Sequence, residues 1–224
     1  DTADFNGVDA AIFLNEGFSD FALIDAAEDA GLVVLDCTDT LAQRGDVAVF
    51  SDGVELDGEA RLFAIADAVS SHAAALLRQL PKGSVKAVNL AIAQPVSVWG
   101  RLGVETLAAE TARLLNGQAP ESSSFGQQLA FNVLSRPANS VAALEHSLSH
   151  LLSTDGGAVT VTASEMLVPV FYGHTVMLRV SCNDAVDLST LKQKLAANEQ
   201  FRLFPQEGIA EASPVSLQES ETID

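Results

Sequence analysis

His174 is the residue of this chain whose position most suggests chemistry. It lies in MLVPVFYGHTVMLRVSC, residues Met166–Cys182, an apolar and β-branched run that is broken at Gly173-His174. Such a run predicts one or two buried strands, and a glycine within it favours a kink that re-aims the next side chain. A histidine titrates near neutral pH and can act as an acid or a base. Taken alone, however, this one is more simply interpreted as a core histidine with satisfied hydrogen bonds.

Two further groups of residues have types that could do chemistry. His146 and His150 are four residues apart in a helical pattern, the spacing at which two imidazoles can share a metal ion. No acidic or thiol partner accompanies them, so we expect a solvated helix face and no metal site. The two cysteines, Cys37 and Cys182, are far apart and lack a CxxC or metal-ligand spacing, which argues against a disulfide framework.

Composition indicates a folded protein with an acidic surface. The 224 residues suffice for one large or two modest domains, and 48% hydrophobic residues can form a full core. The net charge of −18, from 12 basic and 30 acidic residues, disfavours nucleic acid and anionic lipid as partners. No apolar run reaches the ~18 residues of a membrane span and no signal peptide is visible, so we expect a cytoplasmic protein. Because the chain opens at Asp1, shortly before a candidate strand, we interpret it as a fragment or as a protein whose natural start is absent.

The elements that would position these residues begin with a parallel α/β pattern. Apolar runs at Val8–Leu14 and Leu32–Leu35 predict buried strands, and the segment between them predicts a helix that ends at Gly31. Strand, helix and strand within about 30 residues form a βαβ unit, which is typical of a parallel sheet. Two more strands are predicted at Val47–Phe50 and Leu62–Ile65.

The remainder alternates longer strands and helices in a less regular α+β pattern, for which we expect a mixed or antiparallel sheet. The predicted helices lie at 69–80, 103–116, 139–153 and 187–197. The predicted strands lie at 85–93, 129–134, 159–163, 168–171, 175–182 and 201–204. The expected fold class is therefore α/β plus α+β, with an α/β domain over 1–69 and an α+β domain over 70–224.

Four segments occur in an order that resembles the aspartate-semialdehyde dehydrogenase family. GLVVLD, at Gly31–Asp36, resembles the later part of that family's nucleotide-binding domain. QPVSVWG, at Gln94–Gly100, resembles its QxxSGxG segment, and FNV, at Phe131–Val133, resembles its FN[VI] segment. VPVFYGHT, at Val168–Thr175, resembles its VPVxxGHS segment. The resemblance covers most of the chain, and four motifs in the right order are more specific than any one of them.

The resemblance implies a partial Rossmann-like NAD(P)-binding domain at 1–69, then a substrate and dimerisation domain at 70–224 whose C-terminal end is incomplete. It also implies a homodimer and an NADP-dependent oxidoreductase of amino-acid biosynthesis that acts on an aldehyde or acyl phosphate. In that family a cysteine thiolate attacks the carbonyl and a histidine acts as acid and base. By resemblance, His174, Ser70 and Gln94 are candidate catalytic residues, and Ser97 and Gly100 are candidate cofactor-binding residues.

The chain departs from the family's pattern at its chemical centre. The family's cysteine lies in an ANPxCS segment before a helix N-terminus, and the corresponding ADAVSS of Ala66–Ser71 puts Ser70 in its place. Leu167 stands where the family has its substrate-binding arginine, and Val98 and Trp99 would crowd the nicotinamide. The Gly-rich loop that holds the cofactor's phosphates is not in these 224 residues, so we expect this chain not to bind NADP tightly.

This combination resembles the cysteine-less, Usg-type branch of the family and leaves two functions open. One is a catalytically inactive homologue, with Ser70 in place of the nucleophile, retained as a dimeric scaffold or binding protein. The other is an active oxidoreductase of the same family with an altered substrate. A third possibility, a serine hydrolase that uses Ser70 and His174, lacks a G-x-S-x-G elbow and an evident acid partner.

Overall fold

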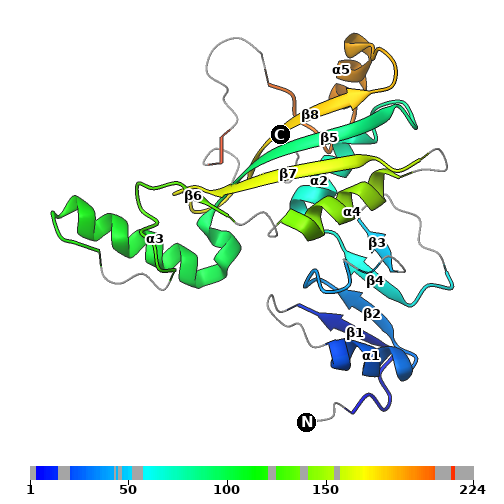
Figure 1. Cartoon of the computed structure of the whole chain (residues 1–224), viewed down its shortest axis with the longest axis horizontal. Helices are drawn as coiled ribbons and strands as arrows, with labels where there is room; N and C mark the ends of the chain where they lie inside the picture. The colour runs from blue at the N-terminus through cyan, green and yellow to red at the C-terminus, as the bar shows by residue number, and fades with distance from the viewer. Residues whose placement is uncertain are drawn as a thin grey trace. The chain divides into compact units, whose positions relative to one another are not determined.

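The computed structural model describes residues 4–14, 21–42, 44, 47–51, 58–120, 125–136, 141–153, 157–204 and 213–214. Its helices are α1 Phe21–Asp29, α2 Ala68–Leu77, α3 Gly100–Leu115, α4 Ala142–Leu152 and α5 Leu188–Ala197, with a short 3₁₀ helix, η1, at Val96–Trp99 (Figure 1). Its strands are β1 Ala10–Phe13, β2 Val33–Asp36, β3 Ala48–Phe50, β4 Leu62–Ile65, β5 Val85–Gln94, β6 Leu134–Ser135, β7 Thr160–Leu167 and β8 Thr175–Cys182. The elements confirm the predicted α/β pattern followed by an α+β pattern.

The chain forms two compact units, each built from separate stretches of sequence. The first unit comprises Asp1–Val88, Ala142–Thr162 and Val180–Ala185. The second comprises Asn89–Val141, Ala163–Arg179 and Val186–Asp224. Because both units are discontinuous in sequence, the domain boundary expected at residue 69 stays a prediction.

The first unit contains the four-stranded sheet β1-β2-β4-β3, in which every pair of neighbours is parallel. The predicted parallel sheet is therefore confirmed. Its core consists of buried apolar residues from the strands, from α1 and from the loop before β3, including Ile24, Val34, Leu41 and Val49. The two remaining helices of this unit, α2 and α4, contact each other.

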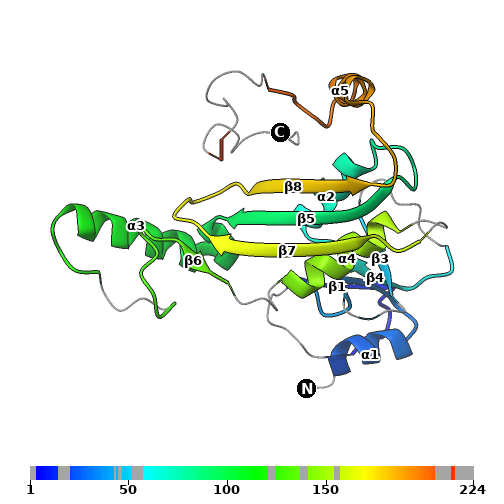
Figure 2. The same cartoon turned by 45° about the horizontal axis from the view of Figure 1, so that its top comes forward.

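The second sheet has the strand order β6-β7-β5-β8, and β5, β7 and β8 each have residues in both units. β6 pairs antiparallel with β7, whereas β8 runs opposite to β5 and β7 (Figure 2). The sheet is therefore mixed, as expected, and the strands predicted at 85–93 and 175–182 are neighbours in it. Along β8, exposed residues such as Met177 and Arg179 alternate with half-buried ones such as Leu178, so this strand has one open face.

Three segments predicted as strands do not form them as expected. Residues 129–133 form a turn before β6, which begins at Leu134. The Glu110 carboxylate accepts hydrogen bonds from the Leu129 and Ala130 N–H groups, and Phe131 has a φ of 58°, which regular strand residues do not adopt.

The segment 168–171 also forms no strand. Pro169 has no N–H group to donate, and the Val170 N–H donates to the Val168 carbonyl of the same segment. At 201–204 only an isolated bridge forms, at Phe201.

A close contact fixes α3 against η1 in the second unit. Gly103 is buried on α3, and a Cβ built there would lie 2.2 Å from the Val96 carbonyl oxygen. Only glycine permits this approach, because every larger residue would push the backbones of α3 and η1 apart. In the part of the chain that the structure describes, neither α3 nor any other helix is long and apolar enough to cross a membrane.

We predict that Gly103→Ala destabilises the protein by about 3 kcal/mol, the upper range for overpacking a well-packed contact. Urea denaturation would measure this as a lower midpoint. Gly58→Ala is the matched control, because a Cβ at Gly58 meets nothing within 4 Å. Equal midpoints for the two variants would contradict the close packing of α3 on η1.

Candidate functional site

Two segments with family-like motifs lie side by side in the second unit. The Val168 N–H donates to the Gln94 carbonyl at 2.9 Å, and the Val96 N–H donates to the Val170 carbonyl at 2.9 Å. The Ser97 N–H donates to the Phe171 carbonyl at 3.1 Å. These hydrogen bonds attach the end of β5 and the start of η1 to the loop that leads to Gly173-His174.

Gln94, the last residue of β5, carries an unusual buried group. The side chain is 7% exposed, and its Oε1 accepts no hydrogen bond within the described part of the protein. Leaving a buried amide oxygen without a donor costs about 1–3 kcal/mol. A ligand or water molecule that donates to this oxygen would recover that free energy, so Gln94 is suited to binding.

His174 lies at the surface of the second unit, immediately before β8. Its interpretation as a core histidine is therefore wrong. Gly173 before it has a φ of 88°, and a Cβ at that position would lie 3.0 Å from the Cα of Pro214. The positive φ and this close approach both require glycine and fix the backbone that presents His174.

Ser70 belongs to the first unit, whereas Gln94, Ser97, Gly100 and His174 belong to the second. Asp67 is the N-cap of α2, and its carboxylate accepts the Ser70 N–H at 3.0 Å. The Ser70 hydroxyl donates to the other oxygen of the same carboxylate and lies 3.4 Å from the Leu144 carbonyl of α4. The side chain has no exposed surface, so this hydroxyl serves the start of α2 and the contact between α2 and α4.

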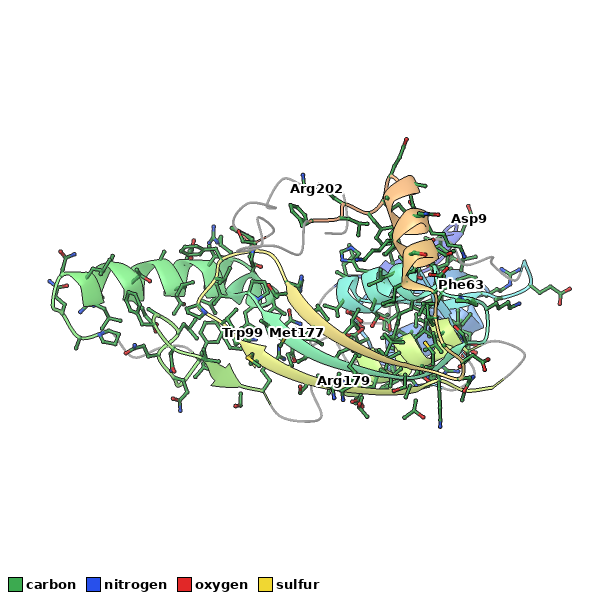
Figure 3. All side chains as sticks on the ribbon, turned by 90° about the horizontal axis from the view of Figure 1, so that it is seen from above. Asp9, Phe63, Trp99, Met177, Arg179 and Arg202 are labelled. Carbon is green, nitrogen blue, oxygen red and sulfur yellow. The ribbon has the colours of Figure 1, made fainter. Side chains whose placement is uncertain are left out.

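The other departures from the family motif are explained by packing within the second unit. Leu167 is 2% exposed and packs in a core with Val96, Leu107 and Leu129. Trp99, labelled in Figure 3, stacks on Phe125 with ring centroids 4.2 Å apart. Positions that the resemblance associates with substrate and nicotinamide are therefore filled by hydrophobic core in this chain.

Glu110 is a structural residue of the site region that we did not predict from the sequence. It is 4% exposed, and its Oε2 accepts the Leu129 N–H at 2.7 Å and the Ala130 N–H at 2.9 Å. It thereby fixes the loop that begins the FNV segment. The sequence does contain a signal for this role: Glu110 is three residues after Leu107 and four before Leu114, so it lies on the apolar face of α3.

Neither cysteine takes the place of a nucleophile at the start of α2. Cys37 follows β2, and burial raises the pKa of its thiol, with Asp36 and Asp39 adding to the effect. A raised pKa leaves less reactive thiolate at neutral pH. Cys182 is half-buried at the end of β8.

His146 and His150 lie one turn apart on α4. Burial lowers the pKa of His150, and the neighbouring His146 lowers it further. Among the described residues, no group of three or more His, Cys, Asp or Glu side chains could hold a metal ion. The expected solvated face is wrong for His146, which is half-buried with a buried Nε2, and correct for His150, which is exposed. The expected absence of a metal stays a prediction.

Comparison with known proteins agrees with the resemblance. A family model described as "Semialdehyde dehydrogenase, dimerisation domain" matches residues 75–222. A USG-1 protein homolog of Pseudomonas aeruginosa is 30% identical over 215 residues, which are 89% of this chain and 62% of that protein. The chain thus spans less than two thirds of the length of this curated relative.

Solved structures show the same fold. The crystal structure of aspartate semialdehyde dehydrogenase II from Vibrio cholerae superposes with a TM-score of 0.77 at 24% identity, over 91% of this chain and 66% of that one. Aspartate semialdehyde dehydrogenase with NADP from Candida albicans superposes with a TM-score of 0.60 at 16% identity, over 84% of this chain and 55% of that one.

Ser70→Ala tests the structural role of the serine. We predict that it lowers the free energy of unfolding by about 2 kcal/mol, because a buried hydrogen bond to a carboxylate is lost. Ser181→Ala, on the exposed side of β8, is the control and should change stability by less than about 0.5 kcal/mol. Denaturant titration of both variants would show the difference, and equal stability would mean that the Ser70 hydroxyl does not support α2.

Proposed function

This chain belongs to the semialdehyde dehydrogenase family, and we propose that it lacks the family's thiol-based dehydrogenase activity and serves as a dimeric scaffold or binding protein. The observation that carries this proposal is the state of Ser70, the residue that the motif resemblance puts in the place of the family's cysteine. Its hydroxyl is fully buried and donates to the N-cap carboxylate of its own helix.

The electrostatics at Ser70 oppose a nucleophile. A hydroxyl is a much weaker acid than a thiol, so it needs a strong neighbouring base to attack a carbonyl. The helix N-terminus favours a negative charge, but the Asp67 carboxylate already occupies that favourable position. A second negative charge on the Ser70 oxygen would be repelled by Asp67, with which it is in direct contact.

Leu167, which stands where the family has its substrate-binding arginine, also supports the proposal. Leu167 supplies no positive charge, and the core around it leaves no room for one without burying an unpaired guanidinium. A substrate carboxylate would therefore lack the bidentate partner that arginine offers in this family.

The residues expected to hold NADP do not fit it well. The Ser97 N–H is already bonded to the Phe171 carbonyl, and Trp99 is held against Phe125. The net charge of −18 also repels the cofactor's phosphates. We therefore propose that this chain binds NADP weakly or not at all.

The alternative is an active oxidoreductase of the family with an altered substrate. It is favoured by Gln94 and His174, which lie in the same unit on two segments joined by backbone hydrogen bonds. Among the described residues no group donates to the Gln94 Oε1, so it is available for a ligand, and the exposed His174 can transfer a proton.

An activity assay separates the two functions. The full-length protein and its Ser70→Ala and His174→Ala variants would each be incubated with NADP, phosphate and aspartate semialdehyde, and NADPH formation would be followed by its absorbance. We expect no turnover above the enzyme-free blank. Turnover that disappears in Ser70→Ala would refute the proposal, and turnover that disappears only in His174→Ala would support the alternative.

We propose that the chain forms a homodimer through the open side of the second sheet. Within the second unit, this side includes Ala91 and Ala93 of β5, Ser164 of β7, and Met177 and Arg179 of β8. The Met177 side chain is 68% exposed, and Figure 3 labels it together with Arg179. Small residues around an exposed methionine suit the self-complementary contact of a two-fold dimer, and the matching family model is that of a dimerisation domain.

We predict a dimer by light scattering at micromolar concentration. Met177→Lys should give the monomer mass, because it places a charge beside Arg179 at the centre of the proposed interface. Leu115→Lys is the control, since Leu115 is 74% exposed at the end of α3, outside the sheet, and this variant should remain dimeric. A monomer for the unmodified chain, or a dimer for Met177→Lys, would contradict this interface.

A further inference from the structure

The first unit contains a pocket that is distinct from the candidate functional site. Its volume is about 550 Å³, within the range of pockets that hold small molecules. It lies where α2 and α4 end and β5 begins, and none of Ser70, Gln94 and His174 lines it. We propose that this pocket binds a small organic anion with an apolar body.

The charge of the pocket is opposite to that of the chain. Arg78, Lys82 and Lys86 line it, and no Asp or Glu does so among the residues that the structure describes. Only 12 of the 224 residues are Lys or Arg, so a quarter of the positive charges surround one pocket of a protein with net charge −18. A local positive field in a concave surface attracts anions.

The wall of the pocket is apolar. It includes Leu77, Leu152 and Val159, which are buried and belong to the ends of α2 and α4 and to the residue before β7. Apolar walls with a few charged groups at the rim are typical of sites for amphipathic small molecules. The carboxylate or phosphate of such a ligand would face the cations while its hydrocarbon part contacts the leucines.

The rim of the pocket is held in place by hydrogen bonds. The turn that carries Lys82 is closed by the Ser84 N–H, which donates to the Pro81 carbonyl at 3.0 Å. Asn183 braces this turn, because its side-chain amide donates to the Gly83 carbonyl at 3.2 Å and its N–H donates to the Ser84 carbonyl at 2.8 Å. A fixed rim reduces the entropy lost on binding.

Arg78 is fixed in a similar way. It is half-buried at the end of α2, and its guanidinium donates to the buried Ser51 hydroxyl at 3.3 Å. Lys82 and Lys86 are exposed, so their long side chains can move toward a bound anion. The pocket therefore combines one fixed cation with two mobile ones.

The test uses octanoate as the probe, with octanol and acetate as comparators that lack the charge or the apolar body. Binding to the full chain would be followed by ¹H–¹⁵N NMR, and octyl phosphate would show whether a phosphate head is preferred to a carboxylate. We expect octanoate to shift the amides of Lys82, Gly83 and Asn183 and to bind about tenfold more tightly than octanol, since two surface ion pairs give about that factor. Equal affinity for octanoate and octanol, or shifts confined to other regions, would overturn the proposal.

Two kinds of variant test separately whether the lysine charges and the volume of the pocket are needed for binding. The double variant Lys82→Gln, Lys86→Gln should lower octanoate affinity about tenfold and leave octanol unchanged. The matched control is Lys192→Gln, Lys194→Gln on α5, outside the pocket, which should change neither. Ala158→Trp should abolish binding of both ligands by filling the pocket while the cations remain. If the lysine variant and its control bind octanoate equally, the pocket does not recognise anions.

Discussion

The candidate site depends on the three backbone hydrogen bonds between Gln94–Ser97 and the Val168–Phe171 loop. They join the end of one strand to the approach of another that is more than 70 positions later in the sequence. They add to the sheet, in which β5 and β8 are neighbours, and hold the backbone before His174 beside Gln94. In the same unit, the buried Glu110 carboxylate of α3 accepts hydrogen bonds from the Leu129 and Ala130 N–H groups, just before the FNV segment. These two N–H groups therefore bond to a side chain and not to a neighbouring strand.

The hydrophobic core of the second unit explains why family-like motifs occur without the family's key residues. Leu167 and Trp99 stand at positions where the resemblance expects chemistry, and both are used for packing instead. Packing requires only apolar volume, whereas substrate binding requires one charge at one place. Many apolar residues satisfy the first requirement and few residues satisfy the second, so the fold can be kept when the residues of a site differ.

Much of the fold could be predicted from the sequence, because its signals are local. The strands at 62–65 and 175–182 and the helix after Asp187 follow from short-range patterns, and they have the predicted bounds or nearly so. The segments 129–134 and 168–171 were mispredicted because their backbone groups bond to Glu110 and to the end of β5, partners that no local pattern reveals. The order of the motifs indicated the family, but the burial of Ser70 depends on Leu144, 74 residues away in sequence. The exposure of His174 likewise could not be read from the apolar residues around it.

The contact between Asp67 and Ser70 also restricts how thiol chemistry could arise at the start of α2 during evolution. A single codon change could convert Ser70 to cysteine, yet the new sulfur would adjoin a carboxylate that raises its pKa. Replacing Asp67 first would remove a cap of α2 and lower stability before any catalytic benefit arose. Each step alone is therefore neutral or harmful, and only both together could be selected. The hydrogen bond that stabilises the start of α2 thus opposes a thiolate at this position.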